Sequence, residues 1–405
     1  MGILSKITDL LLGQPMFNLL QKAQKMEISG RRIIHYEIGD PSFDSPPHAI
    51  EAAKEALDAN LTHYTSSMGL FEYREAIREY TKANSGFKPS IDQVLACPAN
   101  AVIDFVIRCT ANPGEEVIYP DPGFPTYYSA ITYNKAIPVG ILLKEENMFR
   151  MSPRDVHDKI TDKTRLIIIN SPQNPTGAVL KEEEILEFAR IAEEHDIYLL
   201  SDEVYAKLTY DKAHYSPSVR DQCKARTIIL NSLSKQYSMA GWRLGYAIGP
   251  EKLIEKMGLL LQTIISCLPA FTQLGGRAAL LGNQEFMDAR IAMLRERRDI
   301  LTEGLNKLPG VSCVVPDGAF YVFANISKTG ITSEEYSEKL LQETGVCVLA
   351  GNYFGKGGSG YIRLCYASSP ISLIEETLEK MKEFHEKIVC NSGLVCSGGE
   401  NAKTY

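Results

Sequence analysis

From about residue 94 onward, short runs of apolar residues alternate with longer stretches whose apolar residues recur at helical spacing. The short runs are rich in β-branched residues or leucine, as in buried strands, and lie at 165–170, 197–201, 227–232 and 244–248. Between the first two lies an amphipathic stretch at 181–194. Strand, helix and strand at this spacing predict a mostly parallel sheet with crossover helices.

Beyond residue 282 the pattern changes. Apolar residues at helical spacing mark one long helix and are Met287, Ile291, Leu294, Leu301, Leu305 and Leu308. Strand-like stretches at 319–323 and 361–365 flank a helical stretch near 333–344, which predicts a second, smaller α+β domain. The first 30 residues are expected to form a helix or arm that lies on the protein or on a partner subunit.

Composition narrows the class of protein. The 405 residues are 44% hydrophobic and 23% charged, which is typical of a soluble globular protein. A formal net charge of −7 argues against nucleic-acid binding, and no apolar run approaches the roughly 18 residues of a membrane span. The nine cysteines form no C-x-x-C pair, and neither they nor the seven histidines show metal-ligand spacing. We therefore expect a cytoplasmic protein without a metal site.

The most informative segment is 231–246, in which Lys235 directly follows an apolar strand. A lysine buried there is costly unless something uses it. An imine to an aldehyde cofactor removes that cost, because the bonded nitrogen need not carry a full ammonium charge. Ser232, Ser234 and Arg243 supply hydroxyls and a guanidinium fork, which together suit a phosphate. The alternative is a surface lysine and arginine that flank a turn.

A second segment, N-S-P-Q-N-P-T-G at 170–177, follows a predicted parallel strand at the carboxyl edge of the sheet, where open α/β folds bind ligands. Two X-Pro bonds stiffen the backbone, and one or both are candidates for the cis form. Such a loop directs Asn174 toward a ligand. A strand-to-helix turn capped by Thr176 is an alternative that is compatible with this role.

A third segment, S-D-E-V-Y at 201–205, also ends an apolar strand. An acid at this edge can hold a protonated ring nitrogen by a charge-assisted hydrogen bond. Pyridoxal phosphate (PLP) requires such a carboxylate, because it is an electron sink only while its pyridine nitrogen is protonated. Asp202 is the candidate acid, and Tyr205 can reach the cofactor's phenolic oxygen. Alternatively, Asp202 caps the following helix.

These motifs resemble those of the fold-type I PLP-dependent aminotransferases of class I/II, which include aspartate, alanine and aromatic aminotransferases. The resemblance covers about 33–384 and also includes E-I-G-D-P-S-F-D-S-P at 37–46, P-D-G-A-F-Y at 316–321 and Y-I-R-L-C-Y at 361–366. It implies an α/β fold with a mostly parallel seven-stranded sheet between helices and a smaller α+β domain. The expected division is an arm at 1–30, a small domain at 31–47 and 284–390, a large PLP-binding domain at 48–283 and a flexible tail at 391–405.

The resemblance also implies roles for matching residues. Lys235 would be the Schiff-base lysine and would move the proton between the substrate's Cα and the cofactor's C4′. Asp202 would pair with the pyridine nitrogen, and Asn174 and Tyr205 would hydrogen-bond the ring oxygen. The remaining cofactor contacts would be Ser232, Ser234 and Arg243 at the phosphate, the backbone amides of Ala99 and Asn100 beside them, and Phe124 stacked on the ring.

Three further residues are implied to bind the substrate or a second subunit. Arg363 would clamp the α-carboxylate of the substrate bidentately, with Gly39 and Asn174 lining the same pocket. Tyr64 matches a tyrosine that reaches the phosphate of the neighbouring subunit, so the resemblance implies a homodimer with shared active sites.

Two departures from the family pattern bear on the cofactor and the substrate. Pro98 stands where many relatives have a glycine-rich phosphate turn, and it has no N–H to donate. Asn100 stands where some aspartate-specific relatives have a lysine for a second carboxylate. Together with the apolar stretch at 264–269, which the resemblance places near the dimer interface, Asn100 favours a neutral or hydrophobic substrate side chain over strict aspartate specificity.

The expected reaction is ping-pong transamination between an α-amino acid and a 2-oxo acid. A β- or γ-eliminating lyase or a cyclising enzyme is the main alternative, because the same scaffold supports those reactions. A regulatory PLP-binding module is less favoured, since residues 1–30 are too short and insufficiently basic for a DNA-binding segment.

Overall fold

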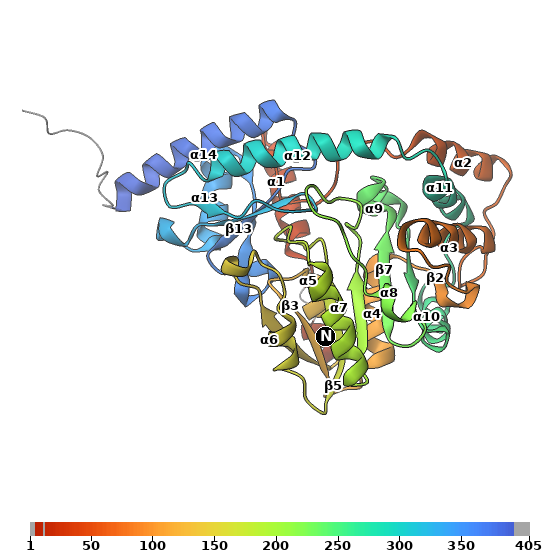
Figure 1. The fold of residues 1–405 in the computed structure, drawn as a ribbon. Coiled ribbons are helices and arrows are strands. Elements are labelled where there is room, and N and C mark those ends of the chain that lie inside the picture. The colour runs from red at the N-terminus through yellow and green to blue at the C-terminus, as the bar shows by residue number, and fades with distance from the viewer. Residues whose placement is uncertain (1–4, 11–12, 393–405) are drawn as a thin grey trace, which may run out of the picture.

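The computed structural model describes residues 5–10 and 13–392. Its centre is a seven-stranded sheet with the order β2-β8-β7-β6-β5-β3-β4 (Figure 1). The strands are β2 (Val94–Ala96), β3 (Glu116–Asp121), β4 (Ile137–Leu142), β5 (Thr164–Asn170), β6 (Tyr198–Asp202), β7 (Thr227–Ser232) and β8 (Gly245–Ile248). β8 alone runs opposite to the other six strands, so the predicted mostly parallel sheet is confirmed.

Helices cover both faces of this sheet because alternate strand residues point to opposite sides. Leu166 and Ile168 of β5 belong to an apolar cluster with residues of α4 and α10, whereas Ile167 and Ile169 belong to one with residues of α7. The large helices around the sheet are α2 (Pro47–Asp58), α3 (Phe71–Ser85), α4 (Ala99–Thr110), α5 (Pro125–Tyr133), α7 (Glu182–Glu194), α10 (Glu251–Ile264) and α11 (Ala270–Leu281). Short helices are α6 (Pro153–His157), α8 (Ser218–Asp221) and α9 (Leu233–Gln236).

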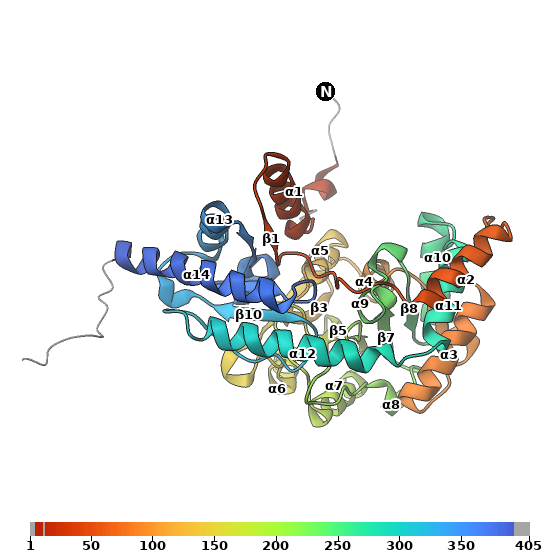
Figure 2. The same cartoon turned by 90° about the horizontal axis from the view of Figure 1, so that it is seen from above.

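A second, antiparallel sheet has the order β12-β13-β10-β9. Its strands are β9 (Ser312–Cys313), β10 (Tyr321–Asn325), β12 (Leu349–Ala350) and β13 (Tyr361–Cys365). Its helices are α12 (Phe286–Leu305), α13 (Ser333–Thr344) and α14 (Ile371–Ser392), and α12 and α14 lie side by side (Figure 2). This is the smaller α+β unit that the sequence predicts.

The N-terminal helix α1 (Pro15–Ile28) packs on the second unit through Ala23, which joins Ile33, Leu341 and Cys347 in one apolar cluster. Next to it, β1 (Ile34–His35) pairs in parallel with β11 (Val346–Cys347). The chain from α1 through β1 therefore passes close to the second sheet before it reaches α2 (Figure 2).

The expected elements agree with the structure to within about two residues in most places, for example at β7 and α13. The strand expected at 319–323 begins at Tyr321, because Ala319 has a φ of 56° and lies in a turn. The expected tail at 391–405 falls outside the described residues except for Asn391 and Ser392, which belong to α14. Within the described part of the chain, no helix is long and apolar enough to cross a membrane. The domain boundaries at 48 and 284 remain a prediction.

Candidate active site

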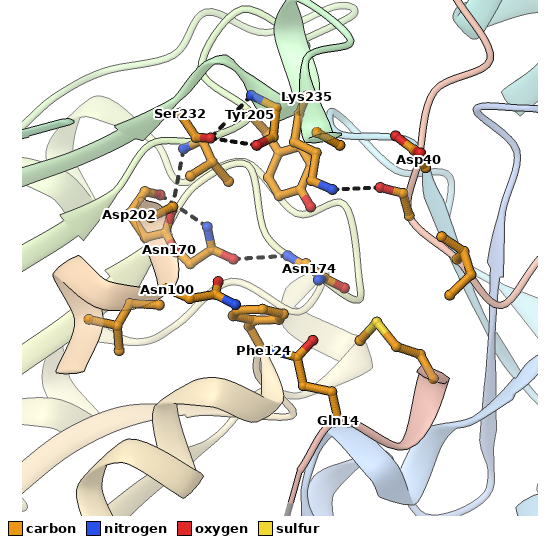
Figure 3. A pocket seen from close by; sticks show the side chains of 18 of the residues that line it. Gln14, Asp40, Asn100, Phe124, Asn170, Asn174, Asp202, Tyr205, Ser232 and Lys235 are labelled. Atoms are coloured by element: carbon orange, nitrogen blue, oxygen red, sulfur yellow. Dashed lines mark hydrogen bonds between the residues drawn. The ribbon is translucent and has the colours of Figure 1, made fainter. Parts of the chain in front are cut away.

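A cavity of about 530 Å³ lies at the carboxyl ends of β5, β6 and β7, next to the second sheet (Figure 3). This is the edge at which open parallel sheets bind ligands. Of the residues expected from the sequence to contact cofactor or substrate, all but Tyr64 line the cavity; they are Gly39, Ala99, Asn100, Phe124, Asn174, Asp202, Tyr205, Ser232, Ser234, Lys235, Arg243 and Arg363. The fold thus brings together residues that lie more than 300 positions apart in sequence.

Lys235 enters the cavity from α9, the short helix that directly follows β7. Ser232 caps this helix, because its Oγ accepts a 3.1 Å hydrogen bond from the Ser234 N–H. The Lys235 ammonium donates a 2.6 Å hydrogen bond to the Gly39 carbonyl (Figure 3). Burial lowers the pKa of Lys235, and nearby Asp40 partly opposes that effect. A neutral, nucleophilic amine is therefore easier to reach here than on the surface.

Asp202 ends β6 and is 4% exposed. Its Oδ2 accepts a 2.5 Å hydrogen bond from the Tyr127 hydroxyl, and its Oδ1 accepts one of 3.3 Å from the Val204 N–H. Burial raises the pKa of Asp202 to about 6, although the Tyr127 hydrogen bond opposes the rise. Asp202 caps no helix, because a turn follows it and the next helix starts at Ser218.

The loop after β5 is braced by Asn170, whose Oδ1 accepts the Asn174 N–H at 2.9 Å and whose Nδ2 donates to the Asp202 carbonyl at 3.0 Å (Figure 3). Both X-Pro bonds of the loop, Ser171–Pro172 and Asn174–Pro175, are cis. The helix-capping role for Thr176 is wrong, since its hydroxyl binds Gln173 and α7 begins only at Glu182. The loop presents Asn174 to the cavity and to Arg363.

Arg363 lies on β13 and is 1% exposed. Its Nη1 donates to Asn174 Oδ1 at 3.2 Å and its Nη2 to the Glu37 carbonyl at 2.5 Å, whereas its buried Nε has no hydrogen-bond partner. The guanidinium also lies 4.5 Å from the Tyr321 ring centroid. Among the described residues no carboxylate pairs with Arg363. A buried guanidinium in this state suits a carboxylate supplied by a ligand.

The N-terminus of α4 borders the cavity through Ala99 and Asn100. Pro98 is the N-cap of this helix, and its carbonyl accepts the Val102 N–H. The N–H that proline lacks would make no hydrogen bond within the helix, so the helix can begin at this residue. The N–H groups of Ala99 and Asn100 belong to the first turn, where unpaired donors and the helix dipole favour an anion. Ser234 and Arg243 line the same cavity. These residues fit a phosphate.

Tyr64 is the exception among the predicted residues. It lies in the loop between α2 and α3, is 89% exposed and does not line the cavity of its own chain. The role implied for it requires a second subunit.

The model of one family, described as aminotransferase class I and II, matches residues 31–381. The chain belongs to this family. It is 40% identical to an aspartate aminotransferase of Pyrococcus horikoshii over 88% of this chain and 91% of that protein. It is 39% identical to aromatic-amino-acid aminotransferase 2 of Thermococcus litoralis over 87% and 91% of the two chains. The structure of an alanine aminotransferase from Pyrococcus furiosus superposes with a TM-score of 0.90 at 31% identity, covering 95% of this chain and all of that one.

The aminotransferase family implies PLP as the cofactor, and the cavity can be tested against that group. A ring with a basic nitrogen needs a buried acid, which Asp202 provides. A phosphate needs clustered donors, which α4 and Ser234 provide, and an aldehyde needs an amine such as Lys235. The residues present therefore fit PLP.

Some residues of this aminotransferase site were not found from the sequence. Tyr127 lies one helical turn after Phe124, in α5, so the shared helix face was an available signal. Tyr321 ends the P-D-G-A-F-Y motif, and its hydroxyl lies 2.8 Å from that of Tyr205. Gln14, Met16 and Phe17 line the cavity from the N-terminal segment, and no local sequence signal pointed to them.

Proposed function

We propose that this aminotransferase binds PLP through Lys235, Asp202 and the α4 phosphate site, and that its amino-acid substrate has a neutral or apolar side chain. The observation that carries this proposal is the convergence of Lys235, Asp202 and Arg363 on one cavity. The amine, the buried acid and the unpaired guanidinium supply the three groups that PLP and an α-carboxylate require. A cytoplasmic location is also proposed, on the dispersed cysteines alone.

The charges around the cavity support a neutral substrate side chain. Among the described residues, its cationic lining consists of Lys235, Arg243 and Arg363, and each has a role in the proposal. A side-chain carboxylate would therefore need a further cation, which residues 5–10 and 13–392 of this protomer do not place there. Met16, Phe17 and Ile38 line the cavity with apolar groups, which suit an apolar side chain.

The roles of the residues follow from their positions. When bound, PLP supplies an electron sink for the bond broken at the substrate's Cα. Arg363 binds the α-carboxylate and so orients the substrate. Lys235 would take the Cα proton of the bound substrate as a general base. Asp202, held as a carboxylate by Tyr127, keeps the ring nitrogen protonated.

A homodimer is part of the proposal. Several large apolar side chains of α2, α3, α10 and their loops are exposed; they are Leu57, Leu61, Tyr64, Phe71, Leu259, Ile264 and Ile265. A surface that exposes several large apolar side chains is typical of a subunit interface. Tyr64 lies within it, which supports a contact with the partner's phosphate site.

The test is an absorbance spectrum of the PLP-loaded protein before and after single amino acids are added. Conversion of the lysine-bound cofactor to pyridoxamine phosphate, selectively with neutral or apolar amino acids, would support the proposal. Lys235→Ala should lose the lysine-linked band and activity, whereas Lys207→Ala, a partly buried lysine at a different cavity, should keep both. Conversion by aspartate alone would overturn the substrate proposal. Release of ammonia and a 2-oxo acid without pyridoxamine phosphate would point to a lyase.

A further inference from the structure

We propose that His35 is a positioning residue, which bridges helix α1 and buried Glu37 and thereby holds the loop that orients both Arg363 and Lys235. The proposal goes beyond the reaction but rests on the proposed role of Arg363 as the carboxylate clamp. Three observations carry it: a buried carboxylate, a doubly bound imidazole and two backbone acceptors on one short loop.

The carboxylate of Glu37 is fully buried, at 0% exposure. Its Oε1 lies 2.7 Å from His35 Nδ1, and its Oε2 has no hydrogen-bond partner. A buried carboxylate is costly unless a cation pairs with it. Among the described residues, His35 is the only basic side chain within ion-pair distance of Glu37.

His35 is held from both sides. Its Nε2 lies 3.2 Å from Oε1 of Glu27, a residue of α1. Carboxylates on both sides favour an imidazolium that donates from each ring nitrogen. The hydrogen bond to Glu37 is the main reason that the pKa of His35 rises to about 9, against an opposing effect of burial. Other titratable groups near this cluster are the Cys347 thiol of β11, the Lys22 ammonium of α1, and the Cys365 thiol and Arg363 guanidinium of β13.

The backbone next to this ion pair serves the active site directly. The carbonyl of Glu37 accepts from Arg363 Nη2 at 2.5 Å. The carbonyl of Gly39 accepts from Lys235 Nζ at 2.6 Å, a contact that Figure 3 shows at the Lys235 ammonium. Residues 37–39 therefore set the position of the clamp and of the lysine. His35 fixes one end of this loop and ties it to α1, whose first turn lines the same cavity. The bridge thus couples the N-terminal helix to substrate binding.

The test compares His35→Gln with His35→Lys, which keeps a positive charge. We expect H35Q to raise KM for both the amino acid and the 2-oxo acid about tenfold, with kcat changed less than about threefold, because carboxylate binding is weakened in ground and transition state alike. H35K should recover most of the loss. In the wild-type enzyme, KM for the 2-oxo acid, which has no amine to titrate, should rise above pH 9 as the imidazolium loses its proton. This rise should be absent in H35Q.

Controls separate this role from a merely structural one. Glu338→Gln breaks an exposed ion pair between Lys22 of α1 and α13 and should leave KM unchanged. Glu27→Gln, at a partly exposed carboxylate, removes the outer half of the bridge without leaving a buried charge unpaired, and should raise KM about two- to threefold even if H35Q does not fold. A lower melting temperature with unchanged KM in H35Q, or unchanged KM in E27Q, would overturn the proposal.

Arg363→Lys distinguishes a failure of this inference from a failure of the proposed function. If R363K raises KM strongly while H35Q and E27Q do not, Arg363 is the clamp but His35 does not position it. If R363K leaves KM unchanged, the clamp itself is wrong, and the positioning role falls with it.

Discussion

The hydroxyl of Tyr127 donates a 2.5 Å hydrogen bond to Oδ2 of Asp202, and both side chains are buried. Tyr127 comes from α5 and Asp202 from the end of β6, so the contact joins two elements that line the cavity. Burial raises the pKa of Asp202 to about 6, and the hydrogen bond limits that rise. Tyr127 therefore helps to keep Asp202 ionised, which is the form that pairs with a protonated ring nitrogen.

Tyr127→Phe should weaken PLP binding, because it removes a donor to the carboxylate and raises the pKa of Asp202 further. A hydrogen bond to a charged group contributes roughly 1.5–3 kcal/mol, which corresponds to about 10- to 150-fold in affinity. The measurement is a PLP titration of the cofactor-free protein. Tyr128→Phe is the matched control, since Tyr128 lies in the same helix and is 41% exposed. Equal affinity in Y127F and Y128F would contradict the role of Tyr127.

Asp202→Asn should cost activity and yet stabilise the cofactor-free protein. Loss of the buried charge is expected to lower kcat by about 10²- to 10³-fold. The raised pKa means that the folded state holds the Asp202 proton more tightly than the unfolded state does. Folding is therefore penalised as pH rises from about 4 to 6, and the penalty, at most roughly 3 kcal/mol, persists above pH 6.

Thermal melts of cofactor-free D202N and wild-type protein between pH 4 and 8 check this prediction. D202N should melt higher at pH 7–8, and the difference should shrink toward zero as the pH falls to about 4. With PLP present, the wild-type protein should melt at a higher temperature than D202N, because only the Asp202 carboxylate pairs with the protonated ring nitrogen. A melting-temperature difference that does not change with pH would show that ionisation of Asp202 carries no stability cost.

The sequence predicted those parts of the site that depend on local pattern. Asp202 and Ser232 each end a short apolar run, and the carboxyl ends of parallel strands meet at one edge. Long-range pairings were not predictable in this way. The contact of Tyr127 with Asp202 spans 75 positions, and the hydrogen bond from Arg363 to the Glu37 carbonyl spans 326. Nor does a local pattern reveal that the first turn of α1 reaches the cavity, since that depends on how α1 packs near β11 and α13.

Gly39→Ala should damage substrate binding through Tyr321. A Cβ built on Gly39 lies 2.1 Å from the Tyr321 hydroxyl oxygen, which is far inside van der Waals contact. Tyr321 would have to move, and its ring faces the Arg363 guanidinium at 4.5 Å. We expect KM to rise at least about tenfold with smaller changes in kcat.

A double-mutant cycle tests the cause of that effect. Tyr321→Phe removes the clashing oxygen, so G39A combined with Y321F should be less impaired than the sum of the two single changes implies. If the effects of the two changes on KM are additive as free energies, G39A acts through the backbone of the 37–39 loop and not through Tyr321.

The position of Tyr64, 89% exposed and outside the cavity of its own chain, gives a complementation test of the shared site. If Tyr64 serves the partner's phosphate site, Tyr64→Phe should weaken PLP binding about tenfold or more. In a mixed dimer of Y64F and K235A subunits, the site with an intact Lys235 also receives an intact Tyr64 from the K235A subunit. Random pairing of equal amounts of the two subunits makes about half of the dimers mixed, and each mixed dimer has one complete site of its two. Activity at limiting PLP should therefore recover to roughly one quarter of the wild-type value. Activity equal to the sum of the separate variants, in a mixture shown to exchange subunits, would mean that Tyr64 does not act across the interface.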